Sequence, residues 1–262
     1  MGQERLVHRI GAPITRLLLS PPVRRTVLGR ALYARLYTLG KGLAERREMR
    51  FLREQVKPGM VVFDVGANIG FYTFLLAGSV GPQGSVHAFE PDPVSFGTLE
   101  QRAARHRNVF VTRAAAGDRA GTVSLFCSPT NRADNRIHPS HEVRPAETFE
   151  VPLLTLDGYC ERRGLERIDA VKMDIQGAEV AALHGFARTL TRLRPSWLLV
   201  EFSPEHLRGA GSTPEDFWKI LSDLGFEPWG FDEDGRPFRI EDTAAFTREH
   251  ETTYTDVWAR RP

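Results

Sequence analysis

Short apolar runs alternate with helical segments along most of this chain. The apolar runs that fit strands are residues 60–65, 85–90, 109–114, 168–175 and 196–202. The segments with helical periodicity are residues 70–79, 93–106, 155–164, 177–190 and 213–224. Strands that alternate with helices in this way are typical of a parallel sheet covered by helices on both faces. The pattern therefore predicts an α/β fold with a doubly wound, mostly parallel sheet.

Two parts of the chain depart from this alternation. Residues 121–127 and 149–154 fit strands on either side of a polar stretch that has neither period, so we interpret that stretch as an excursion over the surface. Near the C-terminus, residues 226–240 and 253–259 fit antiparallel strands at the edge of the sheet, with a turn at Asp234–Gly235.

The first 57 residues have a different character. Leucines recur at one-turn spacing on one helical face, at positions Leu28, Leu32, Leu36, Leu39 and Leu43. We therefore predict an N-terminal helical segment, residues 1–57, before a single domain, residues 58–262. The segment carries 13 lysines and arginines against 4 acids, whereas the whole chain has a net charge of only +2. Its basic face could be solvated, could dock on the acidic remainder of the chain, or could contact phosphates or a membrane surface.

Composition places the chain among ordinary globular proteins. Hydrophobic residues make up 41% and charged residues 26% of the 262 positions. No apolar run approaches the roughly 18 residues needed to span a bilayer, and the first ten residues lack the features of a secretory signal. Cys127 and Cys160 are the only cysteines, too few for a disulfide framework. We expect a cytoplasmic protein with two packed thiols.

Four acidic residues stand at or near the ends of four predicted strands. They are Asp64, Glu90, Asp174 and Glu201. In a doubly wound sheet the carboxyl ends of the parallel strands share one edge, so these acids should line one crevice. A buried carboxylate needs hydrogen-bond donors. Ligand hydroxyls, a ligand ammonium group and helix N-terminal amides are the donors available there.

The loop after the first strand indicates which ligand fits. Its sequence is G-A-N-I-G, residues 66–70, which lacks the G-x-G-x-x-G spacing of dinucleotide-binding loops. Asp64 would repel a pyrophosphate but could attract an amine. Glu90 ends the next strand, where an acid accepts hydrogen bonds from ribose hydroxyls. A nucleoside with positive charge and no phosphate satisfies both constraints, and S-adenosylmethionine is such a ligand.

Several motifs carry a resemblance to a known family. In chain order they are "VFDVGANIGFYT", "FEPDP", "AAAGDRAG", "TLD" and "VKMDIQGAE". Together they resemble the FkbM-type methyltransferases, which are S-adenosylmethionine-dependent O-methyltransferases of the class I, Rossmann-like fold. The resemblance covers roughly residues 50–240. It implies the same fold, cofactor and reaction for this chain.

The resemblance also implies where the cofactor binds. It places Asp64, Gly66, Ala67, Asn68 and Gly70 around the methionine part of the cofactor, Glu90 on the ribose, Ala116, Gly117 and Asp118 near the adenine, and Asp174 beside the sulfonium. Each position also has a structural interpretation: glycines in a tight turn, acids that cap the following helix, and Asp118 in a type I turn.

The catalytic candidates follow from the chemistry. Methyl transfer is an in-line displacement, and a weakly acidic hydroxyl needs a base nearby. Asp174 is the first candidate, and Glu179 and His206 are the others. Glu179 could instead cap free amides in the first turn of its helix. A divalent metal held by Asp174 and Glu201 is a further alternative, which no spacing in the sequence establishes.

The polar excursion is the candidate for acceptor binding. Its candidate residues are Asn131, Arg132, Asn135, Arg136 and His138. Mixed donors and acceptors suit a glycosyl unit, although an exposed loop has the same composition. We expect a small-molecule acceptor, namely a hydroxyl of a sugar, a glycolipid or a polyketide-derived compound, and no nucleic acid.

Three rival functions stay open at this point. A nucleic-acid methyltransferase could use the basic N-terminal segment, but Asp174 is followed by I-Q-G-A-E and not by the Pro-Pro-aromatic turn of many amino-methylating enzymes. A non-catalytic S-adenosylmethionine-binding module would lack a reason for the acids after the later strands. A nicotinamide-dependent reductase is disfavoured by the glycine spacing.

Overall fold

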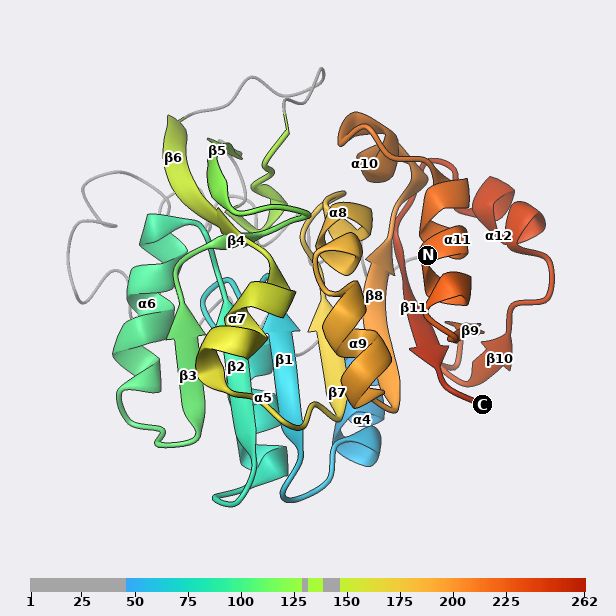
Figure 1. Ribbon diagram of the computed structural model, residues 1–262. Coiled ribbons are helices and arrows are strands. Elements are labelled where there is room, and N and C mark those ends of the chain that lie inside the picture. The colour runs from blue at the N-terminus through green and yellow to red at the C-terminus, as the bar shows by residue number, and fades with distance from the viewer. Residues whose placement is uncertain (1–45, 129–131, 139–146) are drawn as a thin grey trace, which may run out of the picture. The chain divides into compact units, whose positions relative to one another are not determined.

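The computed structural model describes residues 46–128, 132–138 and 147–262 (Figure 1). The described residues divide after Gln55 into two compact units, which we describe separately. In the first unit the described element is helix α4 (Arg46–Gln55). The predicted leucine face lies outside the described residues, so the helical N-terminal segment stays a prediction. Among the described helices, none has the length and apolar character needed to cross a bilayer.

The second unit is built on an eight-stranded sheet. Its strands, in spatial order, are β10 (Pro237–Arg239), β9 (Glu227–Phe231), β11 (Thr255–Arg260), β8 (Trp197–Phe202), β7 (Ala170–Met173), β1 (Val61–Val65), β2 (Ser85–Phe89) and β3 (Val109–Thr112). The strands from β8 to β3 are parallel to one another, and β11, β9 and β10 are antiparallel to their neighbours. The predicted α/β class, with a mostly parallel sheet and antiparallel C-terminal strands, is confirmed.

The order of the strands fixes where a ligand can bind. Strand β1 lies between β2, the next strand along the chain, and β7, which follows much later. The chain therefore leaves β1 in one direction and later returns to its other side. Ligands of such sheets bind in the crevice at this switch point, beyond the carboxyl ends of the strands.

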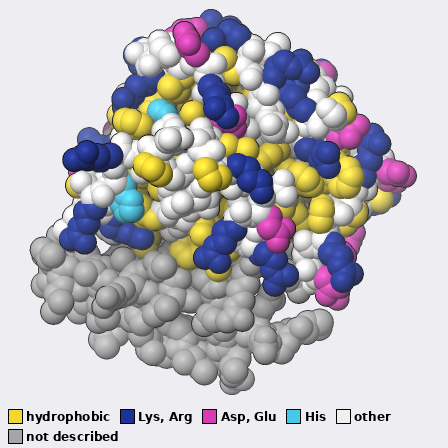
Figure 2. Space-filling view, turned by 90° about the horizontal axis from the view of Figure 1, so that it is seen from below, with side chains coloured by type: hydrophobic (Ala, Val, Ile, Leu, Met, Phe, Trp, Pro, Cys, Tyr) yellow, Lys and Arg dark blue, Asp and Glu magenta, His cyan; other side chains and the backbone are white. Residues whose placement is uncertain are grey.

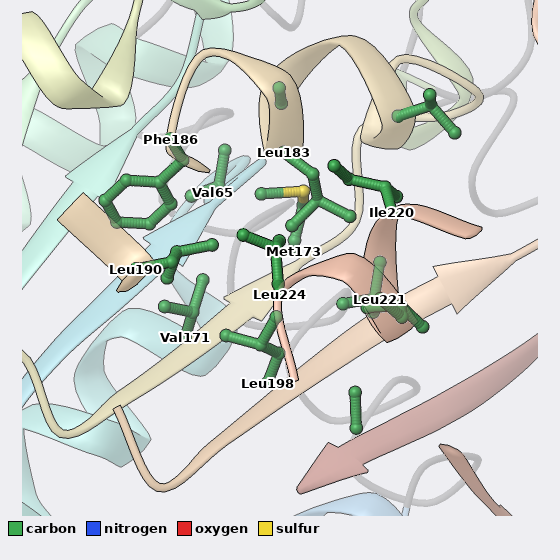
Figure 3. Close-up of a cluster of buried hydrophobic side chains, with 14 of the residues drawn as sticks. Val65, Val171, Met173, Leu183, Phe186, Leu190, Leu198, Ile220, Leu221 and Leu224 are labelled. Carbon is green, nitrogen blue, oxygen red and sulfur yellow. The ribbon is translucent and has the colours of Figure 1, made fainter. Parts of the chain in front are cut away.

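Helices cover both faces of the parallel strands. Every residue of β7 and β8 is buried, as expected for parallel strands covered on both sides. On one face, Val171, Met173 and Leu198 point toward leucines of the covering helices (Figure 3). The helices over this face include α7 (Leu156–Arg163), α8 (Glu179–His184), α9 (Ala187–Leu193) and α11 (Pro214–Asp223). On the other face, α5 (Phe71–Val80) and α6 (Pro93–Ala103) pack against β1 to β3.

A small separate sheet flanks the predicted excursion. Its order is β4 (Ala115–Ala116), β6 (Glu147–Leu154), β5 (Gly121–Cys127), and it lies beyond the carboxyl ends of β2 and β3 (Figure 1). A short 3₁₀ turn, η1 (Arg132–Asp134), and a bridge between Phe126 and Arg136 extend it. The pattern predicted β5 and β6 but missed β4, whose two alanines are too short a run to show a period.

One predicted helix is wrong. The segment 177–190 forms two helices, α8 and α9, because Gly185 lies directly against the carbonyl group of Gly117 and the chain bends there. Two short helices were also missed: α10 (Pro204–Gly209), capped by Ser203, and α12 (Thr243–Glu249), capped by Asp242. Both begin with recognisable capping residues, but neither is long enough to show a hydrophobic period.

The surface charge differs from the charge counted along the chain. Residues 58–262 together have more acids than bases. Figure 2 nevertheless shows lysine and arginine side chains spread over the described face from which the parallel strands begin, with few acids among them. The loops at this end include the exposed residues Arg105, Arg107 and Arg194, and the exposed Arg163 ends α7. The cationic character is therefore not confined to the N-terminal segment.

Replacing Gly185 with alanine is expected to destabilise the fold, because the added methyl group would overlap the carbonyl oxygen of Gly117. Overpacking of this kind costs roughly 1–3 kcal/mol. The matched control is Gly97→Ala in α6, where a Cβ meets nothing within 4 Å and alanine favours the helix by roughly 1 kcal/mol. Urea denaturation measures both. An unchanged free energy of unfolding in Gly185→Ala would contradict the contact.

Candidate active site

Two loops meet at the switch point of the sheet. The loop after β1 has three residues with positive φ, Gly66 at 87°, Asn68 at 50° and Gly70 at 87°. A Cβ on Gly66 would overlap the carbonyl oxygen of Asp174, in the loop after β7. Only glycine permits this approach of one backbone to the other. The glycines therefore serve the tight turn that the sequence left open as their structural interpretation, and their contact with the cofactor stays a prediction.

Asp64 is buried beneath the first of these loops. Its Oδ2 accepts a hydrogen bond of 2.6 Å from Oγ1 of Thr73, in the first turn of α5. The N-cap of α5 is Gly70, which offers no side-chain cap to the first amides of the helix. Uncapped N-terminal amides and the helix dipole favour a negatively charged ligand group at this point. A carboxylate and an ammonium group could thus bind side by side here.

Glu90 joins the ends of β1 and β2. Its Oε2 accepts a hydrogen bond of 2.7 Å from the amide of Asn68, and its Oε1 accepts one of 2.8 Å from the amide of Asp92. Each carboxylate oxygen has a second lone pair for a ligand hydroxyl. Burial raises the pKa of Glu90 to about 8, despite the two amide donors. A ligand whose hydroxyl groups donate hydrogen bonds to the Glu90 carboxylate would offset this desolvation, and binding of such a ligand would therefore be favoured.

The predicted adenine region lies at the end of β4. Ala116 is buried, and Gly117 donates a backbone hydrogen bond of 3.0 Å to Leu154 in β6. Asp118 is exposed and forms an ion pair of 3.1 Å with the adjacent Arg119. This geometry fits the turn interpretation of Asp118, and its contact with adenine stays a prediction.

A cluster of polar side chains joins the ends of β7 and β8. Gln176 lies at its centre, with a positive φ of 57°. Its side-chain amide donates to Asp174 at 3.1 Å and to both carboxylate oxygens of Glu201, at 3.2 and 3.0 Å. Lys172 donates to the other oxygen of Asp174 at 3.3 Å. We did not identify Gln176 from the sequence; its position between a strand-end acid and Gly177 was the available signal.

Glu179 faces the backbone of the same loop. Its two carboxylate oxygens accept hydrogen bonds of 2.9 Å from the amides of Ile175 and Gly177, and the residue is only 1% exposed. Burial, followed by the nearby charge of Glu201, raises its pKa to about 8. These contacts are those of the capping role that the sequence left open, in which the side chain holds the loop in shape.

His206 and Arg136 meet on the other side of this cluster. Nη2 of Arg136 donates to Nε2 of His206 at 3.0 Å, and Nδ1 of His206 lies 3.9 Å from Oε2 of Glu201. Burial and the charge of Arg136 lower the pKa of His206. The imidazole is therefore held in its neutral form.

The excursion brings only some of its candidate residues to the site. Besides Arg136, His138 is buried there, and its Nε2 donates to the carbonyl oxygen of Gln176 at 2.9 Å. Asn135 turns back, since its Oδ1 accepts from the amide of Ser128 at 3.0 Å. Asn131 and the side chain of Arg132 lie outside the described part of the chain.

The described residues add no support for the divalent metal site that the sequence analysis considered. No group of three or more His, Cys, Asp or Glu side chains within the described residues could hold a metal ion. Asp174 and Glu201 instead share the amide of Gln176. A divalent ion on these two acids stays an untested prediction.

Comparison with known proteins gives a consistent family. The model of the "Methyltransferase FkbM domain" family matches residues 64–228. The 31-O-demethyl-FK506 methyltransferase FkbM of Streptomyces tacrolimicus is 31% identical over 159 residues, which are 50% of this chain and 61% of that protein. Hexuronic acid methyltransferase AglP of Haloferax volcanii is 26% identical over 180 residues, 68% of each chain.

A third relative is the 2-O-methyltransferase NoeI of Sinorhizobium fredii, which is 28% identical over 168 residues, 58% of this chain and 66% of that protein. The match thus spans about three fifths of the length of the first relative. The family match begins at Asp64 and includes the loops after β1, β2, β7 and β8.

At Glu90 we expect a pH-dependent loss of stability in the cofactor-free protein. Its pKa is about 8 in the folded chain, against an ordinary value of 4.5. Between these values the folded state keeps a proton that the unfolded state releases, so the free energy of unfolding falls as the pH rises. In Glu90→Gln this contribution is absent, and the fall should be shallower.

Urea denaturation at several pH values between about 5 and 8 measures the two slopes. Part of the slope should persist in Glu90→Gln, because the pKa of Glu179 is raised in the same direction. The exposed Glu215 supplies the control, since Glu215→Gln should keep the slope of the original protein. Equal slopes for Glu90→Gln and the original protein would show that Glu90 is ionised in the folded state.

Proposed function

Because the chain belongs to the FkbM methyltransferase family, we propose that it is an S-adenosylmethionine-dependent O-methyltransferase with a small-molecule acceptor. The acceptor hydroxyl belongs to a sugar, a glycolipid or a polyketide-derived compound. The observation that carries the proposal is the placement of Glu90, whose carboxylate holds the glycine loop at Asn68 and keeps a lone pair on each oxygen. The name of the relative AglP, a hexuronic acid methyltransferase, supports a sugar acceptor, and the name of NoeI, a 2-O-methyltransferase, supports transfer to an oxygen.

The residues around the switch point fit this cofactor. The uncapped start of α5 suits the carboxylate of the methionine part, and the carboxyl group of buried Asp64 lies below the loop as a hydrogen-bond partner for its ammonium group. Glu90 suits the ribose hydroxyls. The glycines at positions 66 and 70 let the loop fold tightly against Asp174 and Phe74 with positive φ. We assign the cofactor to Asp64, Gly66, Ala67, Asn68, Gly70, Glu90, Ala116, Asp118 and Asp174.

The bound cofactor supplies an electrophilic methyl group on a sulfonium. Within the protein, Asp174 receives donors from Lys172 and Gln176, which favour its ionised form and keep a negative charge at the switch point. His206 is neutral and therefore able to take a proton from the acceptor hydroxyl. We assign proton acceptance to His206, charge stabilisation to Asp174, and to Glu179 the positioning of the loop between them.

The remaining assignments concern the class of acceptor, the N-terminal segment, the oligomeric state and the location of the protein. The name of AglP, a hexuronic acid methyltransferase, supports a small-molecule acceptor over nucleic acid. Contact of the basic N-terminal segment with a membrane surface stays a proposal, as does the oligomeric state. Both cysteines of the chain, Cys127 and Cys160, are buried thiols that form no disulfide, which supports the proposed cytoplasmic location.

Calorimetry with S-adenosylhomocysteine should detect binding to the folded protein. Glu90→Gln and Asp64→Asn should each weaken it by about tenfold or more, because hydrogen bonds to charged groups are worth roughly 1.5–3 kcal/mol. Glu215→Gln, on the exposed face of α11, should leave the affinity within about twofold. If the original protein does not bind, or both site variants bind as tightly as it does, the proposal fails.

Incubation with isotopically labelled S-adenosylmethionine and a panel of glycosides and hydroxylated metabolites should give a labelled product by mass spectrometry. His206→Gln should lower the rate of product formation by roughly 10²-fold or more, as expected for loss of a general base, while S-adenosylhomocysteine affinity stays unchanged. His184→Gln, at the exposed end of α8, is the matched control. A His206→Gln variant with full activity would remove His206 from the chemistry.

A further inference from the structure

Arg136 has an uncommon partner. Its described hydrogen bond runs from Nη2 to Nε2 of His206, 3.0 Å away. Among the described residues, no ion pair joins Arg136 to a carboxylate, and its guanidinium donates to no side chain other than that of His206. A guanidinium is a planar fork of five donors that matches carboxylates in a bidentate way. A neutral imidazole nitrogen uses one of these donors.

The position of Arg136 is fixed by the excursion. Its backbone exchanges two hydrogen bonds with Phe126 of β5, of 2.8 and 3.1 Å. The side chain is half-buried and reaches across to α10, 70 residues further along the chain. The small sheet therefore delivers one cationic group to the edge of the site, next to the base assigned above.

The contact also blocks that base. Arginine only donates, so Nε2 of His206 accepts and the ring proton lies on Nδ1, which faces Glu201 at 3.9 Å. The lone pair needed to take a proton is thus occupied. The charge of Arg136 opposes an imidazolium, whereas nearby acids favour it: Asp134, Glu179, Glu205 and Glu201.

We propose that Arg136 binds a carboxylate on the acceptor, close to the reacting hydroxyl, and thereby releases Nε2 of His206. This inference rests on the proposed methyl transfer and narrows its acceptor to hydroxylated carboxylic acids such as uronic acids. A carboxylate replaces one hydrogen bond to a neutral nitrogen with two charge-assisted bonds. Binding of the acceptor thus frees the lone pair of Nε2 that takes the proton.

The proton balance of the step is complete with these groups. The acceptor hydroxyl donates to the released Nε2. As the new O–CH₃ bond forms, the C–S bond breaks and its electron pair stays on sulfur, while the proton of the hydroxyl passes to Nε2. Glu201 faces the resulting imidazolium through Nδ1, and the bound carboxylate cancels the charge of Arg136. The proton is lost to water after product release.

The carboxylate could also come from the amino-acid part of the cofactor. The uncapped start of α5, after β1, is the better site for that group. Arg136 contacts α10, which follows β8. The acceptor is therefore the favoured source, and cofactor affinity separates the two: binding of S-adenosylhomocysteine should be the same in Arg136→Met and the original protein.

Rates with matched acceptors test the proposal. Uronic acid glycosides (glucuronide and galacturonide) should be methylated at least about tenfold more efficiently than the corresponding neutral hexosides, and the preference should appear in kcat as well as in KM, because only the carboxylate frees the base. Arg136→Met should abolish this preference, and Arg136→Lys should restore part of it. Arg248→Met, which removes an exposed charge on α12, should leave the preference intact.

A second readout does not depend on turnover. In the complex with S-adenosylhomocysteine, ¹⁵N NMR of the original protein should show Nε2 of His206 changing its shift when a uronide, but not a neutral hexoside, is added. The ring of His138 should keep its shifts and serves as the internal control.

The outcomes distinguish failure of the Arg136 proposal from failure of the proposed function. Equal or better methylation of neutral hexosides, or no response of His206 to either uronide, overturns the proposal while the methyltransferase assignment stands. Loss of S-adenosylhomocysteine binding in Arg136→Met would assign Arg136 to the cofactor instead. Absence of cofactor binding and of any labelled product in the original protein would defeat the proposed function itself. Circular dichroism of each variant verifies folding.

Discussion

The contact between Gly66 and the carbonyl group of Asp174 is the constraint on which the site depends. It closes the switch point of the sheet, where β1 lies between β2 and β7. Any side chain at Gly66 would push the two loops apart, and with them the acids that follow β1 and β7. Because the backbones touch, a ligand on the first loop also lies next to the loop that carries Asp174 and Gln176. The packing of the main chain thus fixes the distance between the loop after β1 and the loop after β7.

Buried carboxylates hold these loops in place. Glu90 binds the amides of Asn68 and Asp92, and Glu179 binds those of Ile175 and Gly177. In each case an acid at the edge of the sheet satisfies backbone donors that have no partner in a strand or helix. Desolvation is the cost, and it raises the pKa of both groups to about 8. The two acids differ in consequence: Glu90 lies where a ligand hydroxyl can bind, whereas Glu179 is enclosed by its own loop.

Much of this arrangement could be predicted from the sequence, because it depends on features that are local in the chain. The apolar runs of β1, β2, β7 and β8, and the acids at their ends, fix the edge at which the site forms. Contacts between distant segments leave no such pattern. The bend at Gly185 depends on Gly117, and the partner of His206 lies 70 residues earlier, in a stretch without a period. Gln176 was missed for the same reason, since its importance comes from Asp174 and Glu201 together.

The excursion gives the site a property that the main sheet alone does not provide. The loops after β1, β2 and β7 suit the cofactor and are built from backbone contacts and buried acids. Arg136 and His138 come instead from the segment between β5 and β6 and meet α10 and the loop after β7. A histidine beside Glu201 alone would favour its charged form. Burial, together with the guanidinium opposite, lowers the pKa of His206 and favours a neutral imidazole. A residue of the excursion thus contributes to the protonation state of His206, and under the proposal above this contact links binding of the acceptor to proton transfer.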